Sequence, residues 1–110
     1  MKKHINDLTD DELNWVISDL EKDSYYNPRD HAIRDYINDW NLGGPVFERE
    51  IDNHQKRVGY FYCNRYKRPG TLEHNITVWA TGKTLLRAAM KCYANSILGY
   101  EIEIPENIYE

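Results

Sequence analysis

The chain has 110 residues, and its 18 acidic and 14 basic side chains give a formal net charge of −4. This length suits one domain over residues 1–110 that buries a modest core without disulfides, and the negative charge argues against a general nucleic-acid binder. No apolar run approaches the roughly 18 residues of a membrane helix, and no apolar segment follows the N-terminal lysines, so we expect neither a membrane span nor a secretory signal.

The first predicted element is a helix over residues 10–22. Thr9 and Glu12 have the spacing of a capping box, and apolar residues follow at helical spacing: Leu13, Val16, Ile17 and Leu20. Pro28 and the apolar side chains after it allow a second, short helix over residues 28–37. The Gly-Gly-Pro triplet at residues 43–45 then predicts an irregular loop.

Three strand-like runs follow, at residues 46–51, 57–64 and 75–80. The intervals 52–55 and 65–73 have the composition of hairpin loops, so the three runs predict an antiparallel meander. Thr84 is a good N-cap for a helix over residues 85–98, which Gly99 would end. Residues 100–104 alternate strictly and predict a last strand, which could lie in the monomer's sheet or pair across a homodimer. We therefore expect an α+β fold, an antiparallel sheet of three to four strands with two main helices packed on one face.

Gly82-Lys83-Thr84, directly before that helix, raises the question of a phosphate-binding loop. A Walker A loop would require a glycine at position 77, where this chain has Thr77. We therefore interpret Thr84 as a helix cap and Gly82 as part of the turn before it. A weaker anion contact at the helix N-terminus stays open.

Two blocks of sequence resemble a known family. DWNLGGPVFERE, residues 39–50, is similar to the D-W-x-x-G-G-P-x-x-E-R-E signature of the phage NinX-like family, and residues 82–105 resemble its C-terminal pattern. The family belongs to tailed bacteriophages and prophages, and its function is unknown. The resemblance implies phage origin and a location in the cytoplasm of the bacterial host.

The best candidate binding surface is formed by Asp39, Trp40, Gly43, Gly44 and Pro45. A tryptophan beside two glycines can stack on a planar ligand or a partner's side chain, with close approach of the backbone. The alternative is a structural turn whose tryptophan packs on the core.

Arg49 is the last candidate site residue. The predicted strand 46–51 places it on the apolar face, where it must pair with an anion or carboxylate. Alternatively, it reaches water from an edge strand.

Basic and aromatic residues also gather in the hairpin region, a pattern found in nucleic-acid binders: Lys56, Arg57, Tyr60, Tyr62, Arg65, Tyr66, Lys67 and Arg68. The net negative charge favours a solvated hairpin instead. The four histidines lack metal-ligand spacing, and no catalytic grouping is evident, so we predict no catalytic residue, metal ligand or cofactor. Cys63 and Cys92 lie in apolar stretches, which indicates buried thiols in a reduced, cytosolic protein.

These observations favour a small phage accessory protein that acts by binding a host protein. Abundant tyrosine and tryptophan suit a recognition surface, and an acidic protein suits a partner with a basic face. One alternative is the sequestering of a small nucleotide-like molecule by Trp40 and Arg49, with residues 82–84 as an anion seat. A nucleotide hydrolase is the third possibility, and it has no positive support in the sequence.

Overall fold

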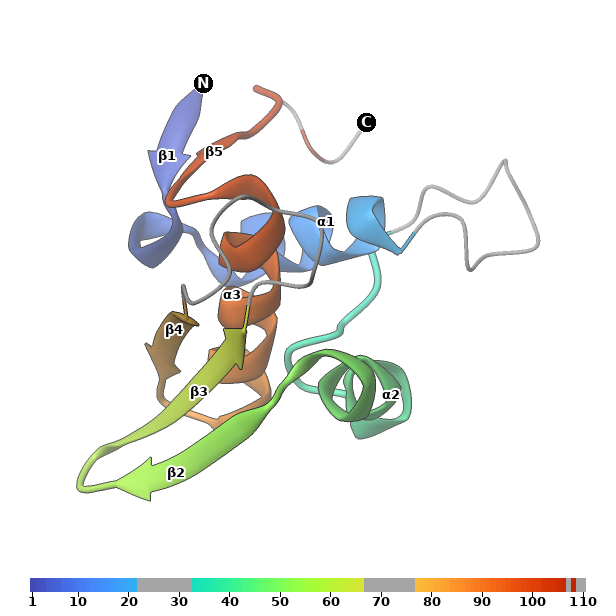
Figure 1. Ribbon diagram of the computed structural model, residues 1–110. Coiled ribbons are helices and arrows are strands. Elements are labelled where there is room, and N and C mark those ends of the chain that lie inside the picture. The colour runs from blue at the N-terminus through green and yellow to red at the C-terminus, as the bar shows by residue number, and fades with distance from the viewer. Residues whose placement is uncertain (22–32, 67–76, 107, 109–110) are drawn as a thin grey trace.

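The computed structural model describes residues 1–21, 33–66, 77–106 and 108, and everything below concerns these residues. Three α-helices and one short 3-10 helix occur among them: η1 (Ile5–Asp7), α1 (Asp10–Leu20), α2 (Trp40–Glu50) and α3 (Leu85–Leu98). Along this part of the chain, a short strand and η1 come first, followed by α1 and α2, three strands, α3 and a last short strand. The first and last strands lie side by side (Figure 1).

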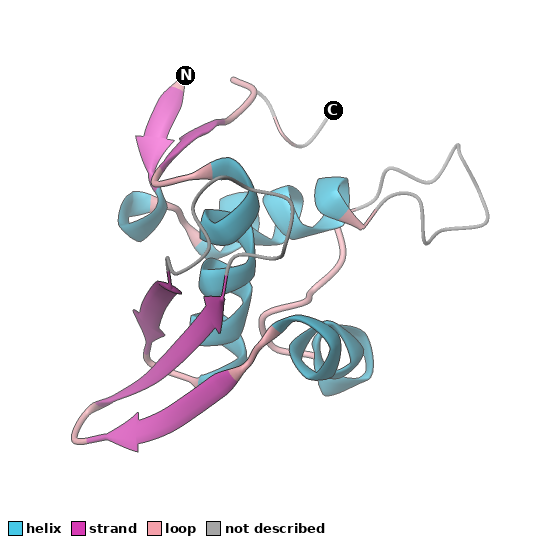
Figure 2. Cartoon of the chain, viewed as in Figure 1, coloured by secondary structure: helices cyan, strands magenta, loops and turns pink. Residues whose placement is uncertain are grey.

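The described strands form two separate antiparallel sheets (Figure 2). The larger sheet has the order β2 (Asn53–Arg57), β3 (Tyr60–Tyr66), β4 (Thr77–Gly82). The smaller sheet pairs β1 (Lys2–His4) with β5 (Glu101–Glu103). The predicted α+β class is therefore confirmed, and the last strand pairs within the chain, with β1 instead of the three-stranded meander.

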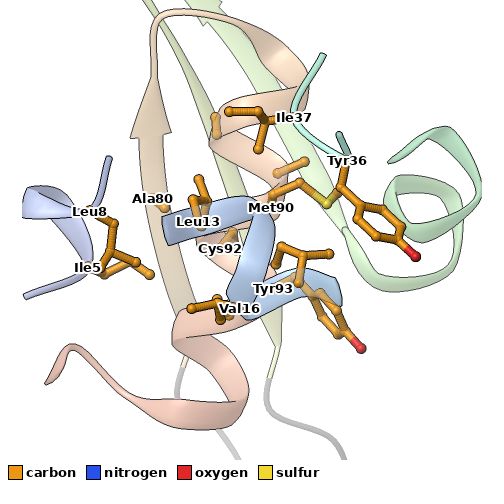
Figure 3. Packing of buried hydrophobic residues seen from close by; sticks show 14 of the residues in the cluster. Ile5, Leu8, Leu13, Val16, Tyr36, Ile37, Ala80, Met90, Cys92 and Tyr93 are labelled. Atoms are coloured by element: carbon orange, nitrogen blue, oxygen red, sulfur yellow. The ribbon is translucent and has the colours of Figure 1, made fainter. Parts of the chain in front are cut away.

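Helix α3 is the centre of the molecule. It covers one face of β3 and β4, and α1 lies across its other side (Figure 2). In the core, Leu13 and Val16 of α1 face Met90 and Tyr93 of α3 (Figure 3). Because α3 lies between the larger sheet and α1, nearly all of its middle residues are buried: 88–90 and 92–95.

The cysteines of the core are free and buried. Cys63 on β3 and Cys92 on α3 are both 0% exposed. Burial raises the pKa of each thiol to about 12, so neither thiol has the lowered pKa of a reactive cysteine. The prediction of buried thiols is confirmed.

The capping box at the start of α1 is present as predicted. The Thr9 hydroxyl accepts the Glu12 backbone N–H at 3.2 Å, and Glu12 Oε1 accepts the Thr9 N–H at 3.0 Å. Lys3 Nζ also contacts the Glu12 carboxylate at 2.8 Å. Burial acts to raise the pKa of Glu12, but the hydrogen bonds from Lys3 and Thr9 outweigh it, so this pKa lies below its ordinary value of 4.5.

Glu12→Gln is expected to lower the free energy of unfolding at pH 7 by about 1–2 kcal/mol, because a charged hydrogen-bond acceptor is lost. A depressed carboxyl pKa stabilises the fold above the unfolded pKa, and this stabilisation is lost as pH falls through the folded pKa. The gap between wild type and variant should therefore shrink below pH 4.5. Urea unfolding at pH 7, 5, 4 and 3 measures it, and a gap that is the same at pH 7 and pH 3 would contradict the role of this carboxylate.

Residues 33–37, the described part of the predicted helix 28–37, are not helical, so that prediction is wrong there. Residues 28–32 lie outside the described residues. Two backbone N–H groups that a helix would use bond to side chains of α1 instead: that of Arg34 donates to Ser18 Oγ at 3.0 Å and that of Ile37 to Asn14 Oδ1 at 3.1 Å. This segment is therefore held against α1 in an irregular conformation.

The predicted strand at residues 46–51, and the loop at 43–45 before it, are both wrong. Trp40–Glu50 is the helix α2, with Pro45 inside it. Pro45 gives up one backbone hydrogen bond in the second helical turn. Apart from Gly44, the half-buried and buried residues of α2 recur at helical spacing: Leu42, Gly43, Val46, Phe47 and Glu50.

The first hairpin of the meander is displaced from the predicted position. Residues 53–55 of the predicted loop 52–55 belong to β2, and the predicted strand 57–64 contains the turn Val58-Gly59 between the paired residues Arg57 and Tyr60. Gly59 has φ 81°, which a turn residue in this position requires and glycine adopts without strain. Residues 77–80 of the predicted strand 75–80 lie in β4, and residues 75–76 lie outside the described residues. The predicted helix 85–98 corresponds to α3.

Among the residues that the structure describes, none of the helices has the length and apolar character to cross a bilayer.

Candidate functional site

The predicted site residues at 39–45 lie on the first half of α2, not in a loop. Asp39 is the N-cap, and its carboxylate accepts the Asn41 N–H at 2.9 Å. Trp40 is the first helical residue and is 53% exposed. Asp39 thus has a structural role, whereas Trp40 presents an exposed ring.

The two glycines of α2 have different surroundings. A Cβ on Gly43 would lie 2.3 Å from the backbone oxygen of Tyr36 and 2.7 Å from a methyl of Leu86. A Cβ on Gly44 would meet only the Trp40 ring, at 3.5 Å. Gly43 is therefore an inter-element packing contact and not a ligand cradle.

Trp40 begins an aromatic row that joins α2 to β2. Its ring meets Phe47 edge-on at 6.0 Å between centroids, and Phe47 meets His54 at 5.2 Å. His54 pairs with the buried Cys63, so it points to the side of the sheet that α3 covers. The Trp40 ring, which joins this row through Phe47, is therefore also on the side of the sheet that α3 covers.

Arg49 lies in the last turn of α2, not on a strand, and it does pair with carboxylates as a clamp would. Its guanidinium contacts Glu21, which is almost fully buried at the end of α1, and Glu50 at 2.6 Å. Arg65 of β3 contacts Glu50 from the other side, and its guanidinium donates to Ser96 Oγ at 2.6 Å. These residues with Tyr93, which we call the ionic network, connect α1, α2, β3 and α3.

Three of the four charged side chains of the ionic network, those of Glu21, Glu50 and Arg65, are shielded from water. The Arg65 and Glu50 side chains are only 11% and 14% exposed. Both guanidinium groups also lie over the Tyr93 ring. Burial and the Glu21 carboxylate raise the pKa of Tyr93 to about 12, and the hydrogen bond with Glu50 is the largest cause of a raised Arg49 pKa. The two acidic and two basic groups balance, so the ionic network holds the elements together and is not an open anion site.

The face of the larger sheet opposite α3 carries aromatic residues, of which the sequence analysis named Tyr60 and Tyr62 only as part of the basic hairpin cluster. Alternation along β3 and β4 turns Cys63, Val78 and Ala80 toward α3 and leaves Tyr62 and Trp79 on the opposite face. These two rings stack at 6.1 Å and an interplanar angle of 22°, and Trp79 is 52% exposed. With Tyr60, which is 44% exposed, they form what we call the open sheet face. Alternation in the predicted strands was the signal that could have identified it.

The predicted basic hairpin cluster does not assemble as a unit. Lys56 and Arg57 are exposed at the end of β2, but Arg65 points inward to the ionic network. Lys67 and Arg68 lie outside the described residues.

The turn before α3 borders a cavity of about 610 Å³. We call it the cationic cavity. Residues of η1, α1, β3, β4, α3 and the turn before α3 line it: Asn6, Asp10, Tyr60, Thr81, Gly82, Lys83, Arg87 and Lys91. From the sequence, residues 82–84 were weighed as an anion-binding turn, but Arg87 and Lys91 were not identified as candidate site residues. Their spacing from Lys83, four and eight residues, was the available signal.

In the described part of the chain, no three His, Cys, Asp or Glu side chains gather closely enough to hold a metal ion. Comparison of the sequence with protein-family models gives no match, and neither does comparison with curated proteins.

Proposed function

We propose that this protein is a small phage accessory protein that acts by binding a protein of the bacterial host. The observation that carries the proposal is the open sheet face, where Tyr62 and Trp79 form an exposed aromatic pair. Tyrosine and tryptophan are the residues that interfaces concentrate and that contribute most to binding energy. The phage origin and the host compartment rest on the resemblance of residues 39–50 and 82–105 to the NinX-like family.

The hairpin adds a second reason to place the contact on this part of the molecule. All five residues of β2 are exposed, and Val58 at the tip of the hairpin is 100% exposed. Strand β2 is also an edge of the sheet, so its outer backbone groups can pair with a strand of another protein. The aromatic pair and the free edge together offer side-chain and backbone contacts on one surface.

Capture of host proteins from a bacterial lysate, quantified by mass spectrometry, tests the proposal with three variants. Trp79→Ser should reduce recovery of the partner at least tenfold, since loss of a central interface aromatic costs about 2 kcal/mol or more. Trp40→Ser on α2 and Tyr100→Ser, both about half exposed, should leave recovery unchanged.

Loss with Trp40→Ser alone would place the contact on α2 and overturn the assignment to the open sheet face. A capture profile that none of the three variants alters would overturn protein binding through these surfaces altogether. Circular dichroism of each variant separates lost binding from lost folding.

A further inference from the structure

We propose that the cationic cavity binds a small nucleoside phosphate. This site is separate from the protein-binding surface proposed above, apart from Tyr60 at their shared border. The volume of about 610 Å³ lies within the range of about 300–1,000 Å³ that small-molecule sites occupy. It is far larger than an inorganic phosphate ion requires.

The charge of the lining favours an anion. Three basic side chains, Lys83, Arg87 and Lys91, and one acidic side chain, Asp10, border the cavity. Asp10 pairs with Arg87 and is itself 61% exposed. The cavity therefore keeps a net positive charge on a protein whose net charge is negative, and it is a local attractor for a small anion.

Arg87 and Lys91 are one helical turn apart, and like charges at this spacing destabilise a helix. Lys91 Nζ donates to the Thr81 carbonyl at 2.9 Å, a neutral acceptor that does not offset its charge. Burial lowers the pKa of Lys91, and the neighbouring Arg87 charge lowers it further. A phosphate between the two side chains would offset both effects.

The turn before α3 is fixed beside the cavity by packing. A Cβ on Gly82 would lie 2.7 Å from the Ala88 nitrogen, so Gly82 lets this turn lie directly against α3. The N-terminal amides of the 14-residue helix α3 add to the positive potential on this side. They supplement the three side chains and do not form the site alone.

Tyr60 indicates the organic part of the ligand. It is the aromatic residue of the lining, and at 44% exposure its ring can accept a stacked base. A mononucleotide fits these features better than a polynucleotide, because the net charge of −4 would repel each further phosphate outside the cavity.

Isothermal titration calorimetry with AMP, GMP, CMP and UMP, and with inorganic phosphate as a separate probe, tests the proposal. We expect at least one nucleotide to bind with a Kd below 1 mM, the weak end of specific affinities (about −4 kcal/mol). Lys83→Gln and Lys91→Gln should each weaken binding at least fivefold. Glutamine at position 91 still has an N–H donor for the Thr81 carbonyl. The matched control is Lys56→Gln, because Lys56 is exposed and lies outside the cavity.

Tyr60→Leu distinguishes the base from the phosphate. It should weaken nucleotide binding and leave any binding of inorganic phosphate unchanged. The proposal would be overturned if wild type bound none of the four nucleotides at millimolar concentration. It would also be overturned if wild type, Lys83→Gln and Lys91→Gln bound with equal affinities. Equal affinity for phosphate alone and for the nucleotides would overturn the nucleoside assignment. None of these outcomes changes what is expected in the lysate capture experiment with Trp79→Ser, so the two proposals can fail separately.

Discussion

Replacement of Gly43 by alanine is expected to lower the free energy of unfolding by about 2–3 kcal/mol, the cost of overpacking a buried contact. The added methyl would lie 2.3 Å from the Tyr36 carbonyl oxygen and 2.7 Å from Leu86. The first of these neighbours is backbone and cannot rotate away. Helix α2 must therefore move off α3 and the segment before it. Urea unfolding followed by far-UV circular dichroism measures the loss.

Gly44→Ala is the matched control. It introduces the same methyl in the same helix, where it would meet only the Trp40 ring at 3.5 Å. Alanine favours a helix interior over glycine by about 0.5–1 kcal/mol, but Pro45 disfavours the helical conformation of a preceding residue that has a Cβ. These effects oppose each other, so this variant should differ from wild type by less than about 1 kcal/mol. A large loss at position 43 beside a small change at position 44 would support the packing of Gly43 in α2, whereas a loop at residues 43–45 predicts similar, small changes for both. That second result would refute the packing role of Gly43.

Arg65→Met is expected to destabilise the protein by about 2–4 kcal/mol, because removing one partner of a buried ion pair leaves the other charge uncompensated. Glu50 would keep only its contact with Arg49, whose side chain is 49% exposed, and Ser96 would lose its guanidinium donor. Chemical unfolding at pH 7 gives the value. The loss should persist at 1 M salt, since buried pairs are screened little.

A second substitution checks the electrostatic origin of this loss. Arg65→Met combined with Glu50→Gln should recover part of the stability, because a neutral amide at position 50 needs no cation. Arg87→Met removes an arginine from a pair whose carboxylate is 61% exposed, and exposed pairs contribute about 1 kcal/mol or less. An Arg65→Met loss no greater than that of Arg87→Met would show that the ionic network does not stabilise the fold.

The parts of the fold that sequence predicts well are those with strong local signals. Helix α1 has a capping box and an apolar stripe, and α3 has the Thr84 cap and Gly99 with φ 85° at its end. Helix α2 was missed because Gly-Gly-Pro normally marks a turn. Its helical conformation depends on tertiary contacts, above all the approach of Gly43 to Tyr36 and Leu86, which no local rule contains.

The candidate sites follow the same division. The exposure of Trp40 and the pairing of Arg49 with carboxylates agree with what the residue types suggest. The partners of Arg49 could not be predicted, because Glu21 is 28 residues distant and reaches it only because α1 and α2 both pack on α3. The cationic cavity likewise depends on η1, α1, β3 and α3 meeting at one place. Spacing identifies its lysines and arginine as neighbours, but only the fold creates a cavity beside them.

The pairing of β1 with β5 determines the order in which the fold can form. Lys2 pairs with Glu103, and the Met1 amino group bonds to Glu103 Oε1 at 2.7 Å. These contacts close a loop of about one hundred residues, with a correspondingly high entropic cost. The β2–β3 hairpin and the packing of β4 on α3 involve much shorter loops. Strands β2 to β4 and α3 can therefore assemble while the chain is still being synthesised, whereas β1 must wait until residue 103 has left the ribosome.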